Sequence, residues 1–241
     1  MKLFGNCIEP RVEEVFDTLG SFDFSSSDEL NKWAKNMYIS QRHRLLQDIC
    51  ACMYLSENKS SILDVGSAPF FTAASLALLD RNVIATDIEP SRFSIFLRKL
   101  DINVIECDIE NEKLPLKENS VDLVLLSEVF EHLRIDLIFT MSEIRRVLRP
   151  GGYLILSTPN FFEIGKMLRL LIKGKTSNIF EEYMKLKSVG HMGHVREYTS
   201  RDVEDFLGKM MLTVEKRIYR GINNWSLRPT SLLKRGALPV C

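Results

Sequence analysis

Short runs of nearly continuous apolar residues recur along the chain, and each predicts a buried β-strand. Strands of a parallel sheet are covered on both faces, so their sequences lack the alternation of half-exposed strands. Five such runs lie at 62–66, 82–86, 103–108, 120–127 and 153–157. A sixth candidate strand follows at 212–220.

The segments between these runs carry apolar residues at helical spacing. Near the N-terminus, Val12, Phe16 and Leu19 lie on one face of a predicted helix. Arg149–Gly152 ends a basic helix and turns the chain into the fifth strand. Further helices are predicted at 39–54, 72–79, 90–100 and 198–210. Strands that alternate with helices predict an α/β protein with a mostly parallel sheet.

The first two runs form a strand–turn–helix–strand unit. Gly66 ends the first run. Asp87 directly follows the second run and lies 21 positions after Gly66. In open α/β sheets a nucleotide-like ligand lies over the carboxyl ends of the strands, where an acid accepts hydrogen bonds from ribose hydroxyls. The unit therefore predicts a nucleotide-type cofactor, although the full G-x-G-x-x-G of nicotinamide enzymes is absent.

Composition and charge narrow the class of protein. Apolar residues make up 45% of the 241 residues and charged residues 27%, as in ordinary globular domains. The formal net charge is zero, so no strong field draws the chain to nucleic acid. The five cysteines form no C-x-x-C pair. We expect a cytoplasmic protein without a signal peptide or a transmembrane segment, since no stretch reaches about 18 apolar residues.

A second cluster of chemically active residues follows the fourth run. Glu128 lies three residues before Glu131 and four before His132, which places the three on one face if the segment is helical. His191 and His194 repeat this chemistry further along the chain. Carboxylates and imidazoles bind divalent cations, and an imidazole also serves as a general base.

These motifs resemble those of the S-adenosylmethionine-dependent methyltransferases of the Rossmann-like class, in particular the type 11-like group. Leu63–Ser67 is similar to the start of their first motif, Asp87 to their ribose-binding acid, and Val147–Gly152 to the turn before their fifth strand. The resemblance implies a Rossmann-like, doubly wound, mostly parallel seven-stranded sheet with helices on both faces. It also implies S-adenosylmethionine as cofactor. The residue pattern adds an N-terminal helical segment and a helical insert after the fifth strand.

The resemblance also carries a set of cofactor-binding residues, with two departures from the usual pattern. Ala68 and Phe70 replace the second and third glycines of the G-x-G-x-G loop. Small Ala68 still lets the backbone approach a ligand, whereas Phe70 must turn away. The implied set is Asp64, Gly66, Ser67, Ala68, Asp87, Ile88, Asp108, Ile109, Ser127 and Glu128, with Asp108 and Ile109 at the adenine.

The E-x-x-E-H pattern followed by a distant histidine resembles that of ubiquinone-pathway O-methyltransferases and of small-RNA 3′-terminal 2′-O-methyltransferases. Both resemblances imply a divalent cation, such as magnesium, that lowers the pKa of the substrate hydroxyl. The implied ligands are Glu128, Glu131, His132 and His194, with His191 as an alternative to His194. Two other roles fit the pattern: metal-free base catalysis by His132 or His194, and a structural role in which the acids orient the cofactor or cap a helix.

Two further segments are candidates for substrate contact. In resembling enzymes the N-terminal helices cover the active site, so the candidates there are Trp33, Tyr38, Arg42 and His43, with plain packing as the alternative. Residues 161–175 combine an apolar helical face with a basic one. This segment is either a lid packed on the core or a surface for anionic substrate, including peripheral contact with a membrane.

We expect one methyltransferase domain over residues 1–241, with N-terminal helices, a cofactor-binding core, a lid or insert and a C-terminal part at 1–58, 59–160, 161–192 and 193–241. The predicted activity is O-methylation of a small molecule, a sugar or a lipid-linked glycan. The alternatives are a non-catalytic binding or scaffold protein and an RNA 2′-O-methyltransferase. The tail at 228–241 is basic and interrupted by prolines, and its pattern predicts no element.

Overall fold

The computed structural model describes residues 10–56, 60–175, 178, 180–181, 183–184, 193–220 and 228–235. The chain begins with helices α1 (Pro10–Gly20), α2 (Asp28–Ser40) and α3 (Arg42–Leu55). The strands are β1 (Ser61–Val65), β2 (Asn82–Asp87), β3 (Asn103–Glu106), β4 (Val121–Ser127), β5 (Leu148–Ser157), β6 (Leu212–Arg220) and β7 (Arg228–Arg235). The later helices are α4 (Phe71–Leu78), α5 (Ser94–Leu100), α6 (Leu137–Val147), α7 (Ile164–Lys173) and α9 (Ser200–Lys209), with 3₁₀ turns η1 (Pro90–Phe93) and η2 (Phe130–His132).

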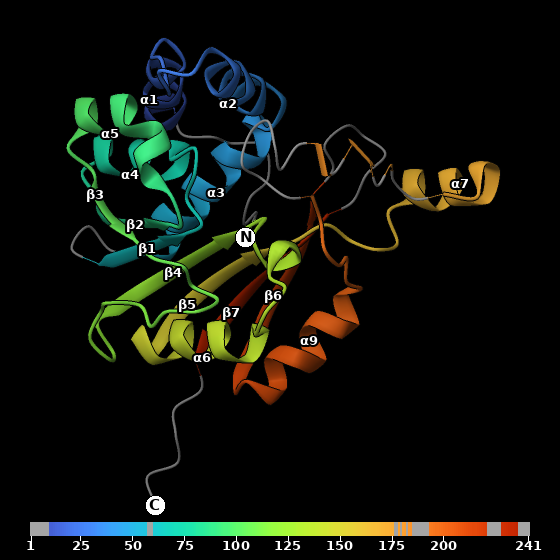
Figure 1. Cartoon of the computed structure of the whole chain (residues 1–241). Helices are drawn as coiled ribbons and strands as arrows, with labels where there is room; N and C mark the ends of the chain where they lie inside the picture. Colours follow the sequence, from blue (N-terminus) through green and yellow to red (C-terminus); the bar gives the residue numbers. More distant parts are fainter. Residues whose placement is uncertain are drawn as a thin grey trace, which may run out of the picture.

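The strands form one sheet in the order β3-β2-β1-β4-β5-β7-β6 (Figure 1). The neighbouring strands β3, β2, β1, β4 and β5 pair in parallel. β7 then pairs antiparallel with both β5 and β6. The predicted Rossmann-like α/β fold is confirmed, with a parallel part of five strands. The resemblance implied seven strands, but no residues were assigned to β7, because its sequence is largely polar and its place depends on backbone pairing with two neighbours.

Helices cover both faces of the sheet, and β4 shows why. Leu123 and Leu125 point into one core with α1, α3, α4 and α5, whereas Val124 and Leu126 point into the other with α6 and α9. Successive side chains of a strand alternate between faces, so a strand covered on both sides must be apolar throughout. This is the physical reason for the continuous apolar runs.

The irregular first part of β5, which follows α6 directly, requires its glycines. Gly151 has a φ of +79°, and a Cβ on Gly152 would lie 2.7 Å from the carbonyl oxygen of Asp122 in β4. The register between β4 and β5 shifts at this point. The structure also starts β5 at Leu148, earlier than the predicted start at residue 153, because the chain pairs with β4 both before and after the glycines.

The expected lid helix is present as α7, but it does not pack on the core. None of its residues is buried, and Figure 1 shows it projecting away from the sheet on a long connection. The prediction of a helical insert after the fifth strand is confirmed, whereas its packing as a lid is wrong for α7. No helix in the described part of the chain has the length and apolarity needed to cross a membrane.

Replacing Gly152 with alanine should lower the free energy of unfolding by about 1–3 kcal/mol, because the new methyl group must displace backbone atoms of β4 and of the turn. Urea unfolding followed by circular dichroism measures this change. Gly208→Ala in α9 is the control, since a Cβ there meets nothing within 4 Å and alanine favours a helix. Equal stability of the two variants would contradict the proposed crowding at Gly152.

Candidate cofactor and catalytic site

The candidate site lies where the sheet reverses its winding direction. β1 pairs with β2 on one side and with β4 on the other, and ligands of open α/β sheets bind outside the carboxyl ends of strands at such a point. A cleft of about 480 Å³ is lined by residues from the ends of β1, β2 and β4 and from the N-terminal helices. Its volume is typical of a pocket for a small ligand.

Gly66 brings the turn after β1 close to the chain after β4. Its φ is +64°, and a Cβ would lie 2.6 Å from Val129 Cγ2. Phe70 has a φ of +69° and is fully buried, with its ring edge-on to Phe93 at 5.8 Å. Phe70 therefore turns into the core and leaves the cleft to Ser67 and Ala68, as the sequence predicted.

Asp87 holds the turn after β1 against the end of β2. Its two carboxylate oxygens accept hydrogen bonds from the backbone N–H of Ala68 (3.0 Å) and of Glu89 (3.2 Å). Ile88, the next residue, is exposed and lines the cleft. The structure thus brings both residues to the place expected for a ribose-binding pair.

Asp64 is a buried acid at the carboxyl end of β1. Its Oδ2 accepts a hydrogen bond from Ser67 Oγ at 2.7 Å. Burial, together with the nearby charges of Asp48 and Asp87, raises the pKa of Asp64 to about 7 despite the opposing hydrogen bond from Ser67. Near neutral pH this carboxyl group is therefore divided between its protonated and charged forms.

A polar network connects α3 to the ends of β4 and β5 beneath the cleft. Arg44 Nη1 donates to Ser127 Oγ at 2.8 Å, and Ser127 Oγ donates to Asp48 Oδ2 at 2.7 Å. Ser157 Oγ lies 2.9 Å from Ser127 Oγ and donates to Glu128 Oε1 at 3.2 Å. Ser127 and Glu128 thus lie in the cleft as expected.

Two residues of this network, Arg44 and Asp48, were not predicted from the sequence. Asp48 is almost completely buried, and Arg44 lies 3.5 Å from it. The available signal was an acid on the apolar face of α3, since Leu45, Asp48, Ile49 and Cys52 follow the i, i+3, i+4, i+7 spacing. A charged residue at such a position is costly unless it has partners, and such residues are often functional.

Asp108 and Ile109 are not brought to the cleft. The carboxylate of Asp108 accepts hydrogen bonds from the backbone N–H of Glu110 (3.0 Å) and from Asn111 Nδ2 (2.8 Å). The carbonyl of Ile109 accepts from Thr140 Oγ1 at 2.9 Å. Neither residue lines the cleft, so the expected adenine-binding pair lies in a turn stabilised by its own hydrogen bonds.

The expected shared helical face of Glu128, Glu131 and His132 is wrong. Glu128 has a φ of +57° and precedes η2, which contains only Phe130–His132. The left-handed backbone at Glu128 turns the chain, so its carboxylate bonds to Ser157 instead of joining the other two residues. Among the described residues, the group that could hold a metal ion is Glu131, His132 and His194, without Glu128.

In this group two imidazoles face one buried carboxylate. The Nε2 atoms of His132 and His194 each lie 3.9 Å from Glu131 Oε1, and the two rings are 5.2 Å apart. Glu131 is fully buried, and its Oε2 accepts from Thr158 Oγ1 at 3.0 Å. The three side chains line the same cleft as the turn after β1. His191 lies outside the described residues.

Hydrogen bonds on the far side of each ring set its orientation. His132 Nδ1 lies 3.3 Å from the carbonyl of Gly193, and His194 Nδ1 lies 2.8 Å from Glu197 Oε1. Both partners accept hydrogen bonds, so each Nδ1–H donates to its partner and each ring turns its Nε2 toward Glu131.

Glu197 is an ionised partner for His194. Burial acts to raise its pKa, but hydrogen bonds from His194 and Lys166 outweigh burial and lower the pKa of Glu197 to about 2. The backbone supports the same arrangement, because the N–H groups of Val195 and Arg196 both donate to the carbonyl of Glu131. The segment that carries His194 is therefore tied to the end of β4.

Of the four N-terminal candidates, Trp33 alone lines the cleft. Tyr38 stacks on Phe16 with ring centroids 4.5 Å apart. Arg42 forms ion pairs with acids of α1, and His43 lies 3.0 Å from Gln47. Packing and surface pairing thus account for these last three candidates.

The chain matches known methyltransferases in sequence. Residues 63–156 match a family model described as a methyltransferase domain. A "probable S-adenosylmethionine-dependent methyltransferase" of Mycolicibacterium smegmatis is 28% identical over 147 residues, or 61% of this chain and 54% of the relative. A protein of the same description from Mycobacterium tuberculosis is 34% identical over 99 residues, or 41% of this chain and 35% of the relative. The chain thus spans about half the length, or less, of these relatives.

Solved structures agree on the fold. Magnesium protoporphyrin IX methyltransferase from Synechocystis, solved with bound S-adenosylhomocysteine, superposes with a TM-score of 0.64 at 11% identity, covering 93% of this chain and 94% of that chain. A chain from the complex between the Haloferax volcanii Trm112 methyltransferase activator and a methyltransferase has a TM-score of 0.65 at 16% identity, covering 90% and 100%. At these identities the likeness shows the fold alone.

Residues 63–156 are thus similar to a methyltransferase domain, and the sheet has the Rossmann-like fold of the solved methyltransferases. The matched relatives are described as S-adenosylmethionine-dependent, and the cleft at the ends of β1, β2 and β4 lies where a nucleotide-type ligand binds in such a sheet. The glycine at the turn, which leaves no room for a Cβ, and the acid at the end of β2 are features of such a site.

The raised pKa of Asp64 predicts a specific pH dependence of stability. Between the ordinary pKa of 3.8 and about 7 the folded state holds a proton that the unfolded state releases, so the free energy of unfolding falls as pH rises through this window. From pH 5 to pH 8, wild type should lose roughly 2–3 kcal/mol more than Asp64→Asn. Urea unfolding of the cofactor-free proteins measures the difference.

Asp101→Asn provides the control for this measurement, because Asp101 is exposed. It should reproduce the wild-type pH dependence. Parallel stability curves for wild type and Asp64→Asn would show that Asp64 is already charged in the folded state at low pH.

Proposed function

We propose that the protein is an S-adenosylmethionine-dependent enzyme that methylates a hydroxyl group of a small molecule, a sugar or a lipid-linked glycan. The supporting observation is a single cleft lined both by the cofactor-type turn, with Gly66 and Asp87, and by the imidazoles of His132 and His194. The acceptor class is inferred from this chemistry, because one fold supports many reactions.

In this proposal the residues of β1, β2 and β4 hold the cofactor. Each oxygen of Asp87 accepts one backbone hydrogen bond and has further capacity to accept from ribose hydroxyls. Arg44, beside Ser127 in the cleft, provides a positive charge suited to the carboxylate of the methionine part. When bound, S-adenosylmethionine supplies an electrophilic methyl group on a sulfonium.

The two histidines provide the base in this proposal. An acceptor hydroxyl is a weak nucleophile until its proton is removed, whereas an amine needs less help. Nε2 of His132 or His194 would take that proton, while the bound cofactor would supply the methyl group to the oxygen. Glu131 stabilises the resulting imidazolium from 3.9 Å, and Glu197 supports His194 from the other side.

A second use of the same group is supported by the convergence of its ligand atoms. One atom from each of Glu131, His132 and His194 lies within 4.8 Å of the other two, and a hydrogen bond from each Nδ1–H to its acceptor orients the rings as in many metal sites. Two imidazoles and one carboxylate suit a transition ion better than magnesium, which prefers oxygen ligands. A cation bound here would lower the pKa of the acceptor hydroxyl.

Titration with S-adenosylhomocysteine in a calorimeter tests the cofactor assignment. Asp87→Asn should weaken binding by roughly 10–100-fold, because one charged acceptor for the ribose is lost. Glu89→Gln is the matched control, since it removes the same charge two residues away at a position outside the cleft. Absence of binding by wild type would refute the enzyme assignment, and equal affinity of Asp87→Asn would refute the role of Asp87.

The histidines should affect methyl transfer far more than cofactor binding. His132→Gln and His194→Gln are expected to bind S-adenosylhomocysteine normally, while transfer to hydroxyl acceptors falls by about 10²–10⁴-fold for the residue that acts as base. A panel of monosaccharides, nucleotide sugars and polyprenyl-linked saccharides provides the acceptors. Transfer to amines but not to hydroxyls by wild type would contradict the proposed O-methylation.

Calorimetric titration of the same proteins with Mn²⁺ separates the two uses of the group. Saturable binding by wild type that is lost in His132→Gln and in His194→Gln would establish the cation site. Absence of binding by wild type would leave base catalysis as the role of the histidines.

A further inference from the structure

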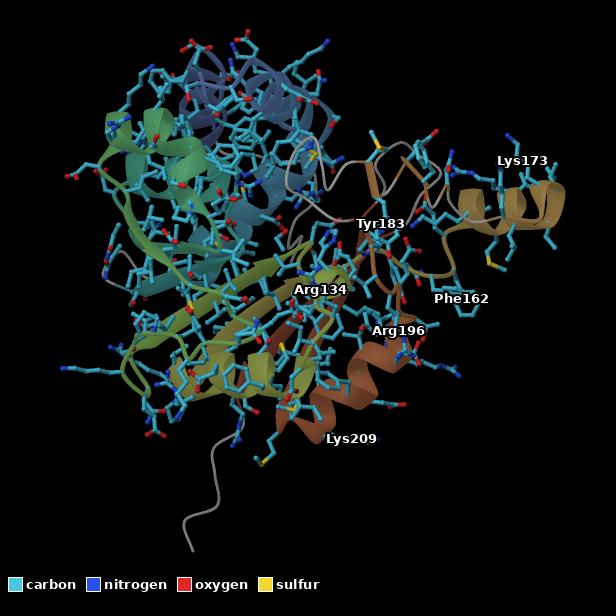
Figure 2. All side chains as sticks on the ribbon, in the orientation of Figure 1. Arg134, Phe162, Lys173, Tyr183, Arg196 and Lys209 are labelled. Atoms are coloured by element: carbon cyan, nitrogen blue, oxygen red, sulfur yellow. The ribbon has the colours of Figure 1, made fainter. Side chains whose placement is uncertain are left out.

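Helix α7 presents an apolar face that no described part of the chain covers. Two exposed phenylalanines, Phe161 and Phe162, precede it. On the helix, the exposed fractions of the large apolar residues range from 54% to 78% for Ile164, Leu168, Leu171 and Ile172. Figure 2 shows side chains of α7 projecting into open space, with Lys173 and Phe162 labelled. A surface of this kind on a protein marks a site of interaction.

The opposite face of α7 is basic. At 100° per residue, Lys166, Arg169 and Lys173 fall on one side of the helix, and Ile164 and Leu168 fall on the other. The segment from Ile164 to residue 175 contains no acidic residue, although the whole chain has zero net charge. Among the described residues, no carboxylate pairs with Arg169 or Lys173, which leaves positive charge on this face.

We propose that α7, with Phe161 and Phe162, docks in the interfacial region of an anionic lipid bilayer. The apolar face would lie among the acyl chains, and the basic side chains would reach the anionic headgroups. Apolar burial and electrostatic attraction then act together, which is how amphipathic helices bind membrane surfaces. The charge of the helix favours this surface over a second copy of the chain, whose α7 would bring a like charge to the contact.

The position of α7 connects this surface to the cleft. Lys166 forms ion pairs with Glu163 and Glu197, and Glu197 accepts a hydrogen bond from His194 in the cleft. A bilayer that fixes α7 would therefore hold the cleft close to the headgroups and favour a lipid-linked acceptor. This choice of acceptor rests on the proposed function, whereas docking itself does not.

Vesicle co-sedimentation of the full chain without cofactor tests the docking. Wild type should bind phosphatidylcholine vesicles that contain phosphatidylglycerol, bind pure phosphatidylcholine vesicles more weakly, and lose the difference at high salt. The variant Leu168→Glu/Leu171→Glu should bind at least about tenfold more weakly, because its apolar face no longer enters the interface. Arg169→Gln/Lys173→Gln should lose the preference for the anionic vesicles.

A matched control carries the same added charge elsewhere. Ile39→Glu/Ile138→Glu replaces two exposed isoleucines of α2 and α6 and should bind vesicles as wild type does. Circular dichroism and S-adenosylhomocysteine binding establish that each variant is folded, so failure of docking is distinguishable from failure of the proposed enzyme.

Three results would overturn the docking proposal. The first is absence of wild-type binding to either vesicle, and the second is equal binding by Leu168→Glu/Leu171→Glu. The third is a wild-type dimer in sedimentation equilibrium that the same substitutions dissociate, because a second copy of the chain would then cover the apolar face.

Discussion

The close contact between the chain segments that leave β1 and β4 is the constraint on which the site depends. Parallel pairing places the two carboxyl ends at the same edge of the sheet. The absence of a side chain at Gly66 then lets the turn pass Val129 at a distance that leaves no room for a Cβ. Without this approach, the turn with Ser67 and Ala68 could not share a cleft with Ser127. The glycine thus has a tertiary role beyond its permissive backbone.

A buried acid joins the two halves of the candidate site. Glu131 holds the segment before α9 through its backbone carbonyl and faces both histidines through its carboxylate. Burying a carboxylate is costly unless hydrogen bonds and positive charge surround it. Thr158 supplies one such bond, and a protonated imidazole or a bound cation would supply the charge. The position of Glu131 is therefore consistent both with base catalysis by the histidines and with a bound cation.

Charged contacts extend from this centre to the surface of the molecule. The order His194, Glu197, Lys166 leads from the cleft to α7, whose large apolar residues are exposed. A helix with no buried residue gains little from the core, so its conformation depends on whatever it meets outside. The histidine cluster of the cleft and the exposed helix α7 are thus connected by side-chain contacts.

The sequence by itself determined the parallel strands and the cofactor turn. Strands buried on both faces must be apolar throughout, and a turn that passes close to another segment must contain a glycine, so both leave local patterns at residues such as Leu123 and Gly66. The turn of Phe70 away from the cleft followed from its size. These features are local, because each residue is constrained by its own backbone and burial.

The tertiary structure decided the rest. β7 has no apolar pattern, and its strand depends on pairing with β5 and β6. Spacing alone placed Glu128 on a helical face with His132, but the left-handed backbone at Glu128 separates them. Arg44 and Asp48 join the site from a helix that sequence spacing assigned to packing. Which side chains meet in a cleft depends on contacts between distant segments, and residue spacing within one segment carries no information on them.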